Sequence, residues 1–277
     1  MLMQSLGIRK RQLAAFMVVA VKSGIRDRVL TAIMVVGLLL LLTTPVVAVF
    51  SMRQVLALAT SYALSIIGLM GLLLTLFIAM GLLARDLEQK HVYTVCSLPI
   101  SRSAYLLGKF LGFAVLILLA VVILGCFCAV DLFVLERIYP TGRGFAWGAF
   151  FVGLWLQYWV FLLVGAITVL FSTVATSNFL PLALSVGLYF GGYSAEAVRY
   201  FIRSSAGQKE LVPVVKFFGN VVYWILPNFS AFDLKEQIIY GVALNAKEIL
   251  LTQWYAFCYL GALLVLSTLA FNRRDFL

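Results

Sequence analysis

The sequence predicts an all-α integral membrane protein whose 277 residues form one membrane domain, 1–277. Its mean hydropathy is +1.07 and 64% of its residues are hydrophobic, whereas soluble domains are about half apolar. Only 12% of the residues are charged, and the apolar residues form runs of the roughly 20 residues that a membrane-spanning helix needs. We expect an N-terminal interfacial amphipathic helix, six transmembrane helices, and outer-face helices between spans five and six.

The first segment, 8–28, is basic at both ends, and Lys22 interrupts its short apolar centre. A cleavable signal would need an uninterrupted apolar centre, so this pattern favours an amphipathic helix that lies in the membrane interface and leads into the first span. A frayed cytoplasmic tail is the alternative.

Six spans follow. The second run has no charged residue across 55–84, which predicts a helix that is tilted or projects beyond the lipid. A later uncharged stretch, 144–195, is too long for one helix. It breaks most naturally at 173–178, because Pro181 then falls in the first turn of the next helix. The expected spans are 29–50, 55–84, 105–130, 145–172, 179–198 and 249–272.

The segment 199–248 is expected on the outer face. Its centre, 212–229, is apolar and aromatic but contains a lysine and two prolines. A seventh span there would move the C-terminal arginine pair outside, so we expect this part to lie on the outer face or dip partway into it. The stretch 228–241 then predicts a turn and a short amphipathic helix, with Asn228 or Ser230 as its cap.

Basic residues are distributed unevenly between the two sides of this arrangement. The inner segments carry 12 basic and four acidic residues, a net charge of +8, and the outer segments carry nine and seven, a net charge of +2. The positive-inside rule then places both termini in the cytoplasm and the chain in the cell (inner) membrane as a multi-pass protein. The net charge of +10 therefore indicates topology and contact with anionic membrane lipids, with no nucleic-acid partner.

The sequence lacks the motifs for nucleotide binding and for metal binding by histidines. Gly241–Glu248 lacks the second glycine and the Ser/Thr of a phosphate-binding loop, and a single histidine excludes a histidine metal cluster. We therefore expect no catalytic residue, metal or cofactor in this chain. Gln157 and Tyr158 form the clearest mid-membrane polar pair. They make either a helix–helix hydrogen bond or a contact on the substrate path.

A polar island, 85–102, separates two apolar runs and contains the single histidine. It predicts a short helix over 86–97, with Asp86 and Glu88 at its N-terminal end and Pro99 stopping it. A solvated loop is the alternative. If the island receives an input from a protein partner, the contact residues are expected to be Asp86, Glu88, Lys90, His91, Tyr93 and Arg102.

The order of elements and several short motifs resemble a known family. The motifs are the acidic pair in the island, Pro99-Ile100-Ser101-Arg102, Tyr105-Leu106-Leu107-Gly108-Lys109, the stretch ILPNFSAFDL at 225–234, and Arg273-Arg274-Asp275. Together they are similar to the membrane subunits of type-2, export-type ABC transporters, especially the multicopper-enzyme-maturation permeases.

The resemblance implies a non-catalytic permease subunit of an ATP-driven exporter, in which 86–97 is the coupling helix. A separate ABC ATPase, in two copies, would bind ATP and Mg, and a second permease chain would complete a homodimer. The alternative is a non-transporting membrane anchor that relays ATPase motion to an extracytoplasmic partner through 199–248. The sequence does not name the substrate.

The topology can be tested with single cysteines that replace Lys90 or Lys209 in a cysteine-free background. An impermeant thiol reagent should label them from opposite sides of the membrane, and the C-terminus should resist protease added outside intact cells. Labelling of both positions from the same side rejects the topology.

Overall fold

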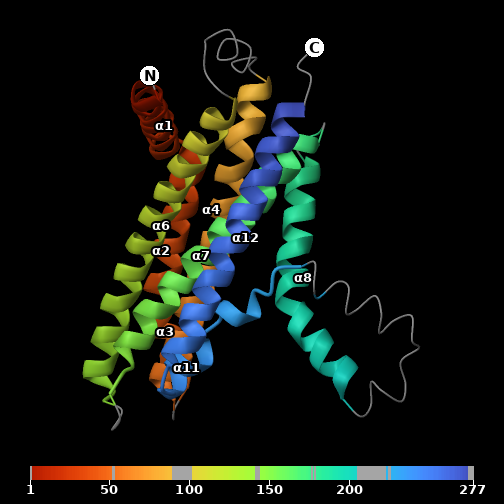
Figure 1. Cartoon of the computed structure of the whole chain (residues 1–277). Helices are drawn as coiled ribbons and strands as arrows, with labels where there is room; N and C mark the ends of the chain where they lie inside the picture. The colour runs from red at the N-terminus through yellow and green to blue at the C-terminus, as the bar shows by residue number, and fades with distance from the viewer. Residues whose placement is uncertain are drawn as a thin grey trace.

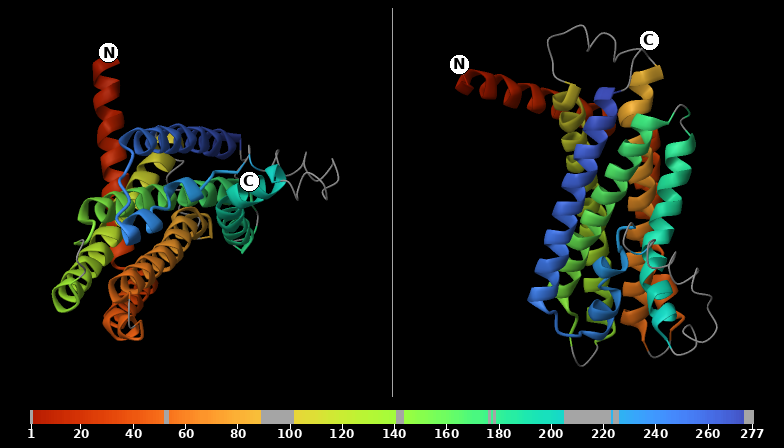
Figure 2. Two further views of the ribbon diagram at one scale, coloured as in Figure 1. Left: turned by 90° about the horizontal axis from the view of Figure 1, so that it is seen from below. Right: turned by 45° about the vertical axis from the view of Figure 1, so that its right-hand side comes forward.

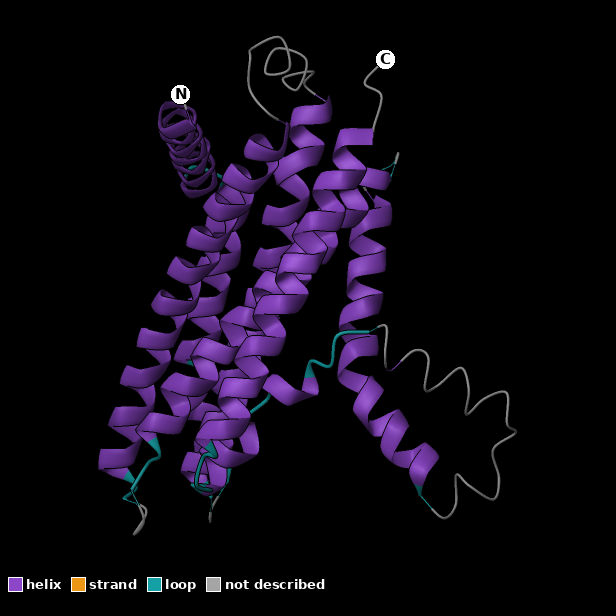
Figure 3. Cartoon of the chain, in the orientation of Figure 1, coloured by secondary structure: helices purple, strands orange, loops and turns teal. Residues whose placement is uncertain are grey.

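The computed structural model describes residues 2–51, 54–88, 102–140, 144–175, 177, 179–204, 223 and 226–273, and the regular elements within these ranges are all helices (Figure 3). The long helices form an elongated bundle (Figure 1). The all-α membrane architecture predicted from the sequence is confirmed.

The first helix, α1 (Leu2–Ile25), lies across one end of the bundle instead of along it (Figure 2). This is the orientation that an interfacial helix needs. The chain then runs back and forth between the two ends, so that α1 and the last turn of α12 lie at the end where α4 stops and α6 begins (Figure 1). The helices that run along the bundle are α2 (Arg28–Leu42) with α3 (Thr44–Val49), α4 (Val55–Glu88), α6 (Arg102–Ile138), α7 (Trp147–Val174), α8 (Phe179–Arg203) and α12 (Ala246–Arg273).

Within the described ranges, five segments are helical, long and apolar enough to cross a membrane: Arg28–Val49, Val55–Gly81, Ser103–Ile138, Trp147–Val174 and Ala246–Arg273. The predicted span 179–198 lies in α8, which has 25 residues but is not in this set. Charged side chains at Glu196, Arg199 and Arg203 dilute its second half, which turns away from the bundle (Figure 1).

The predicted helix boundaries hold in some places and shift in others. The expected break at 173–178 is confirmed, since α7 ends at Val174 and α8 begins at Phe179. The expected continuous helix 29–50 is interrupted at Thr43, because Pro45 begins a new helix there and has no N–H to continue the old one. The described α6 is longer than 105–130 at both ends.

Helix α7 is the centre of the bundle. In its most apolar window 72% of the residues are buried, against 11% in α12, which packs on one side of it. Rings from α6 and α7 fill the places that glycines leave open. The ring of Phe161 in α7 lies against Gly71 of α4, and the ring of Phe113 in α6 lies against Gly165 of α7. Any side chain at either glycine would collide with the ring.

The described part of the segment between α8 and α12, residues 226–245, packs against the bundle toward the end away from the termini (Figure 1). It contains a 3₁₀ turn, η1 (Ser230–Phe232), and the predicted short helix, α11 (Lys235–Tyr240). The expected cap was wrong. Asp233 Oδ1 accepts from Lys235 N at 3.0 Å, whereas the Ser230 hydroxyl donates to the Tyr193 carbonyl at 2.8 Å and is therefore occupied elsewhere.

The contact between α1 and α6 depends on two glycines one helical turn apart. A Cβ on Gly112 would lie 2.5 Å from Ala20 Cβ and 2.9 Å from the Met17 carbonyl oxygen. A Cβ on Gly108 would lie 2.8 Å from Phe16 Cβ. This small-xxx-small spacing lets two helix backbones approach closely, as in membrane helix dimers.

We expect Gly112→Ala to lower the thermal stability of the purified chain in detergent, because overpacking of this kind costs about 1–3 kcal/mol. Gly261→Ala in α12 is the matched control, since no atom lies within 4 Å of a Cβ built there. This control should be neutral or stabilising, because alanine is the better helix former by about 1 kcal/mol. Equal melting temperatures for the two variants would contradict the close α1–α6 contact.

Candidate functional site

The described ends of the polar island, 85–88 in α4 and Arg102 in α6, lie at the end of the bundle that holds α1 and the last turn of α12 (Figure 1). The structure places Asp86 and Glu88 in the final turn of α4, so the expected new helix beginning at Asp86 does not start there. The rest of the expected helix 86–97, from residue 89 on, lies outside the described residues. Lys90, His91 and Tyr93 lie outside the described residues. The coupling role of the island stays a prediction.

Directly after the island, Tyr105 joins three helices at one point. Its ring stacks on Phe271 of α12 with centroids 6.2 Å apart and meets Phe16 of α1 edge-on at 5.3 Å. Lys109 Nζ lies over the same ring, 5.0 Å from its centroid. Tyr105 is 4% exposed and follows Arg102, the first residue of α6, by one turn. A displacement of the start of α6 would therefore reach α1 and α12 through this aromatic contact.

These contacts explain three residues of the short motif Tyr105-Leu106-Leu107-Gly108-Lys109. Tyr105 links α6 to its two neighbours, Gly108 admits the backbone of α1, and Lys109 covers the tyrosine ring. Sequence reasoning missed Phe16 and Phe271, whose only signal was their aromatic character within otherwise apolar helices.

The polar pair in α7 separates in the structure. The Tyr158 hydroxyl donates to the Ala114 carbonyl of α6 at 3.2 Å, which is a helix–helix hydrogen bond. Gln157 projects toward α4 instead, where its Nε2 would lie 3.9 Å from a Cβ on Gly68. Adjacent helical residues project about 100° apart, so the two side chains reach different neighbours. The substrate-path role of either residue stays a prediction.

Gln157 also lines a small cavity between α4, α7 and α11. The space is about 20 Å³, close to the room that one water molecule needs. Asp233 and Lys235 line it as well, and Lys235 Nζ donates to Ser65 Oγ of α4 at 3.4 Å. The hydrogen bond from Lys235 ties α11 to α4, and the cavity is too small for a substrate in this conformation.

A larger cleft of about 650 Å³ opens beside it, between α7, α8, α11 and the start of α12. Its charged lining residues are Glu196, Asp233 and Glu248. Two of these are held in place, since Asn245 Nδ2 donates to Glu248 at 2.9 Å and Asn228 Nδ2 donates to Glu196 at 3.5 Å. The lining is rich in acceptor oxygens, so the cleft suits a group that donates hydrogen bonds. Sequence reasoning missed it, because its residues come from α7, α8 and the stretch 230–252, which only the folded chain brings together.

The described residues contain no group of three or more His, Cys, Asp or Glu side chains that could hold a metal ion. The polar side chains of both regions instead form hydrogen bonds, aromatic contacts and an acidic cleft. These arrangements can position helices and receive a polar ligand.

Comparison with protein families finds a match to the ABC-2 family transporter protein over residues 21–276. The chain belongs to the ABC-2 transporter family. It is therefore a multi-pass membrane protein and a permease component of an ABC transporter, and as an ABC-2 permease it associates with an ABC ATPase subunit and is not itself catalytic. A search of curated proteins found no match. The closer resemblance to multicopper-enzyme-maturation permeases stays a prediction.

Two substitutions in this ABC-2 permease should separate the roles of the α7 pair. Tyr158→Phe should cost about 0.6 kcal/mol of stability, the average for a hydrogen bond between membrane helices, and leave ATPase activity of the assembled transporter near wild type. Gln157→Leu should change the substrate-stimulated ATPase rate, because it removes a polar side chain that lines the cavity between α4, α7 and α11. Equal effects of both substitutions on both measurements would contradict this division.

Proposed function

We propose that the chain is the transmembrane permease subunit of an ATP-driven ABC exporter. Two copies form a homodimer, and two ATPase subunits bind at the end of the bundle that holds the polar island. Each ATPase binds ATP with Mg and passes the free energy of hydrolysis to the permease, which moves substrate across or out of the membrane. Membership of the ABC-2 family over residues 21–276 is the observation that carries this proposal.

The uneven distribution of basic residues supports a cytoplasmic location for the ATPase-binding end. The segments expected inside carry 12 basic residues against four acidic ones, and they include α1, the island and the end of α12. In the structure α1, the end of α4, the start of α6 and the end of α12 lie at one end of the bundle (Figures 1 and 2). On this basis both termini face the cytoplasm, and the membrane is the cell (inner) membrane.

The geometry around Tyr105 supports coupling through the island. A force applied between the end of α4 and the start of α6 acts one helical turn from the contact that joins α6, α1 and α12. Three helices would therefore respond together to one input.

The acidic cleft supports substrate movement. At about 650 Å³ it has the size of a small-molecule site, and it lies toward the end of the bundle opposite to the island. A permease needs such a space on the far side from its ATPase, where substrate leaves.

Coupling can be tested at Tyr93, the aromatic residue of the island. In the transporter assembled in lipid, Tyr93→Ala should weaken ATPase binding by about 2 kcal/mol or more, because a buried aromatic anchor dominates such contacts. Lys90→Ala should do less, since rim charges mainly change association rates. The measurements are co-purification of the ATPase and its hydrolysis rate, with expression of the permease as a check on folding.

Tyr240→Ala is the matched control, because Tyr240 is 64% exposed in α11 at the opposite end. The purified permease alone should hydrolyse no ATP, and substrate flux in vesicles distinguishes export from a mechanical relay. If Tyr93→Ala combined with charge reversal at Asp86 and Glu88 leaves assembly and hydrolysis unchanged, the island is not the coupling element.

A further inference from the structure

The elbow between α1 and α2 carries a group of basic side chains that the function above does not use. Helix α1 ends at Ile25 and α2 begins at Arg28, so the chain turns there from across the bundle into it (Figure 2). Asp27 makes the turn possible by capping α2, with its Oδ1 accepting from Val29 N at 2.9 Å. Lys22, Arg26 and Arg28 surround this turn.

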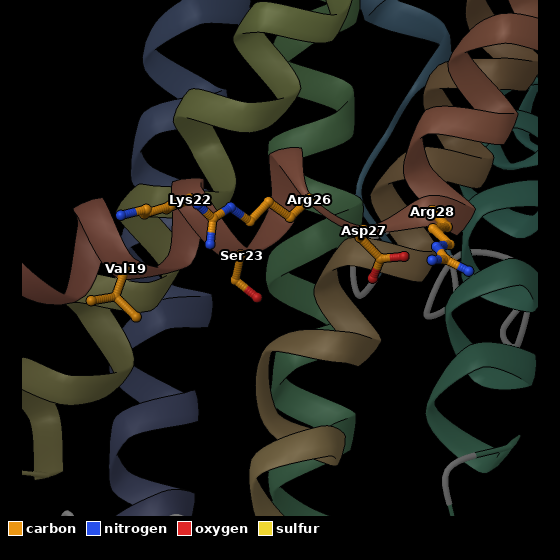
Figure 4. Close-up of a pocket in the computed structure, with 6 residues that line it drawn as sticks. All are labelled: Val19, Lys22, Ser23, Arg26, Asp27 and Arg28. Carbon is orange, nitrogen blue, oxygen red and sulfur yellow. The ribbon is translucent and has the colours of Figure 1, made fainter.

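These side chains line a cleft of about 670 Å³, whose lining residues are Val19, Lys22, Ser23, Arg26, Asp27 and Arg28. Figure 4 shows the long side chains of Lys22 and Arg26 next to each other, with the Ser23 hydroxyl projecting from the turn between them and Arg28 on the far side of Asp27. Lys22, Ser23, Arg26 and Arg28 are all exposed. The cleft is therefore accessible and bordered by three cations and one carboxylate.

Lys22 and Arg26 are four residues apart on one helix, so two like charges face each other and repel. Among the side chains that the structure describes, no acid forms an ion pair with Lys22, Arg26 or Arg28. The carboxylate of Asp27 is committed to the cap of α2 by one of its oxygens. An anion between Lys22 and Arg26 would remove their repulsion and find a hydroxyl donor in Ser23.

Exposed apolar side chains next to these cations indicate which kind of molecule the anionic group belongs to. Val18, Val19 and Ile25 are 58%, 63% and 61% exposed in the turns around Lys22. In a membrane protein such side chains face lipid, and an interfacial helix with cations beside them lies at the level of the headgroups. A phospholipid offers both groups in one molecule, a phosphate for the cations and acyl chains for the valines.

We propose that the α1–α2 elbow is a binding site for the phosphate group of an anionic phospholipid. Lys22 and Arg26 hold the phosphate from two sides, the Ser23 hydroxyl donates to it, and Val19 contacts the acyl chain. Arg28 adds positive potential from the start of α2. Because Gly24 in the same turn packs on Leu116 of α6, the bound lipid also fixes the elbow against α6.

The test uses the purified full chain in neutral detergent, with phosphatidylglycerol or phosphatidylcholine added at equal concentration and retained lipid counted by native mass spectrometry. Wild type should retain phosphatidylglycerol over phosphatidylcholine. The double variant Lys22→Gln/Arg26→Gln should bind phosphatidylglycerol about 30-fold more weakly, because each basic side chain near a membrane surface contributes the equivalent of about fivefold. Lys22→Arg, which keeps the charge, should bind as wild type does.

The control variant Arg203→Gln/Lys247→Gln removes the same net charge from exposed residues of α8 and α12. If it loses phosphatidylglycerol as strongly as the elbow variant, the effect is one of net charge and the site is overturned.

A second control adds inorganic phosphate as a soluble competitor, at the same total phosphate concentration as the lipid. Full displacement of the lipid by inorganic phosphate would show a general anion site and overturn the assignment to a phospholipid. Equal retention of the two lipids by wild type would also overturn it.

Discussion

Close packing at small residues is the interaction on which this bundle depends. Helices in lipid gain little by burying apolar surface against one another, because acyl chains are as apolar as leucine. Their association relies on contact distance, and glycine provides it. The ring of Phe161 occupies the space at Gly71, the ring of Phe113 that at Gly165, and α1 approaches α6 at Gly108 and Gly112. The buried position of α7 and the docking of α1 both follow from these contacts.

The same packing determines how the two ends of the bundle differ. At the end where α6 begins, Tyr105 holds α1, α6 and α12 together through aromatic contacts, so this end suits the entry of a mechanical input. At the other end α8 turns away (Figure 1), α11 packs on α4 and α7, and η1 lies between α7 and α8. Asparagine and glutamate side chains from separate segments then meet around an open cleft. A rigid joint at one end and a polar space at the other are what an ATP-driven permease requires.

The elbow between α1 and α2 is the point at which the bundle would be held to the membrane surface. An interfacial helix can pass motion to the bundle only if its position relative to the lipid is fixed. The glycine contacts fix α1 to α6, and the proposed phosphate site at Lys22 and Arg26 would fix the elbow to the headgroups. The basic residues that set the topology in the sequence would thus also serve as specific ligands.

The sequence by itself determined the membrane class, the helical content and most helix positions, including the break between α7 and α8. These follow from local properties, namely the length of apolar runs and the places where polar residues and proline stop them. Only the tertiary structure decided that Tyr158 binds a carbonyl of α6 while Gln157 faces α4, that α4 continues through Glu88, and that the hydroxyl of Ser230 binds a carbonyl of α8 instead of capping α11. Each of these depends on the rotation and spacing of neighbouring helices, which side-chain packing between distant segments sets.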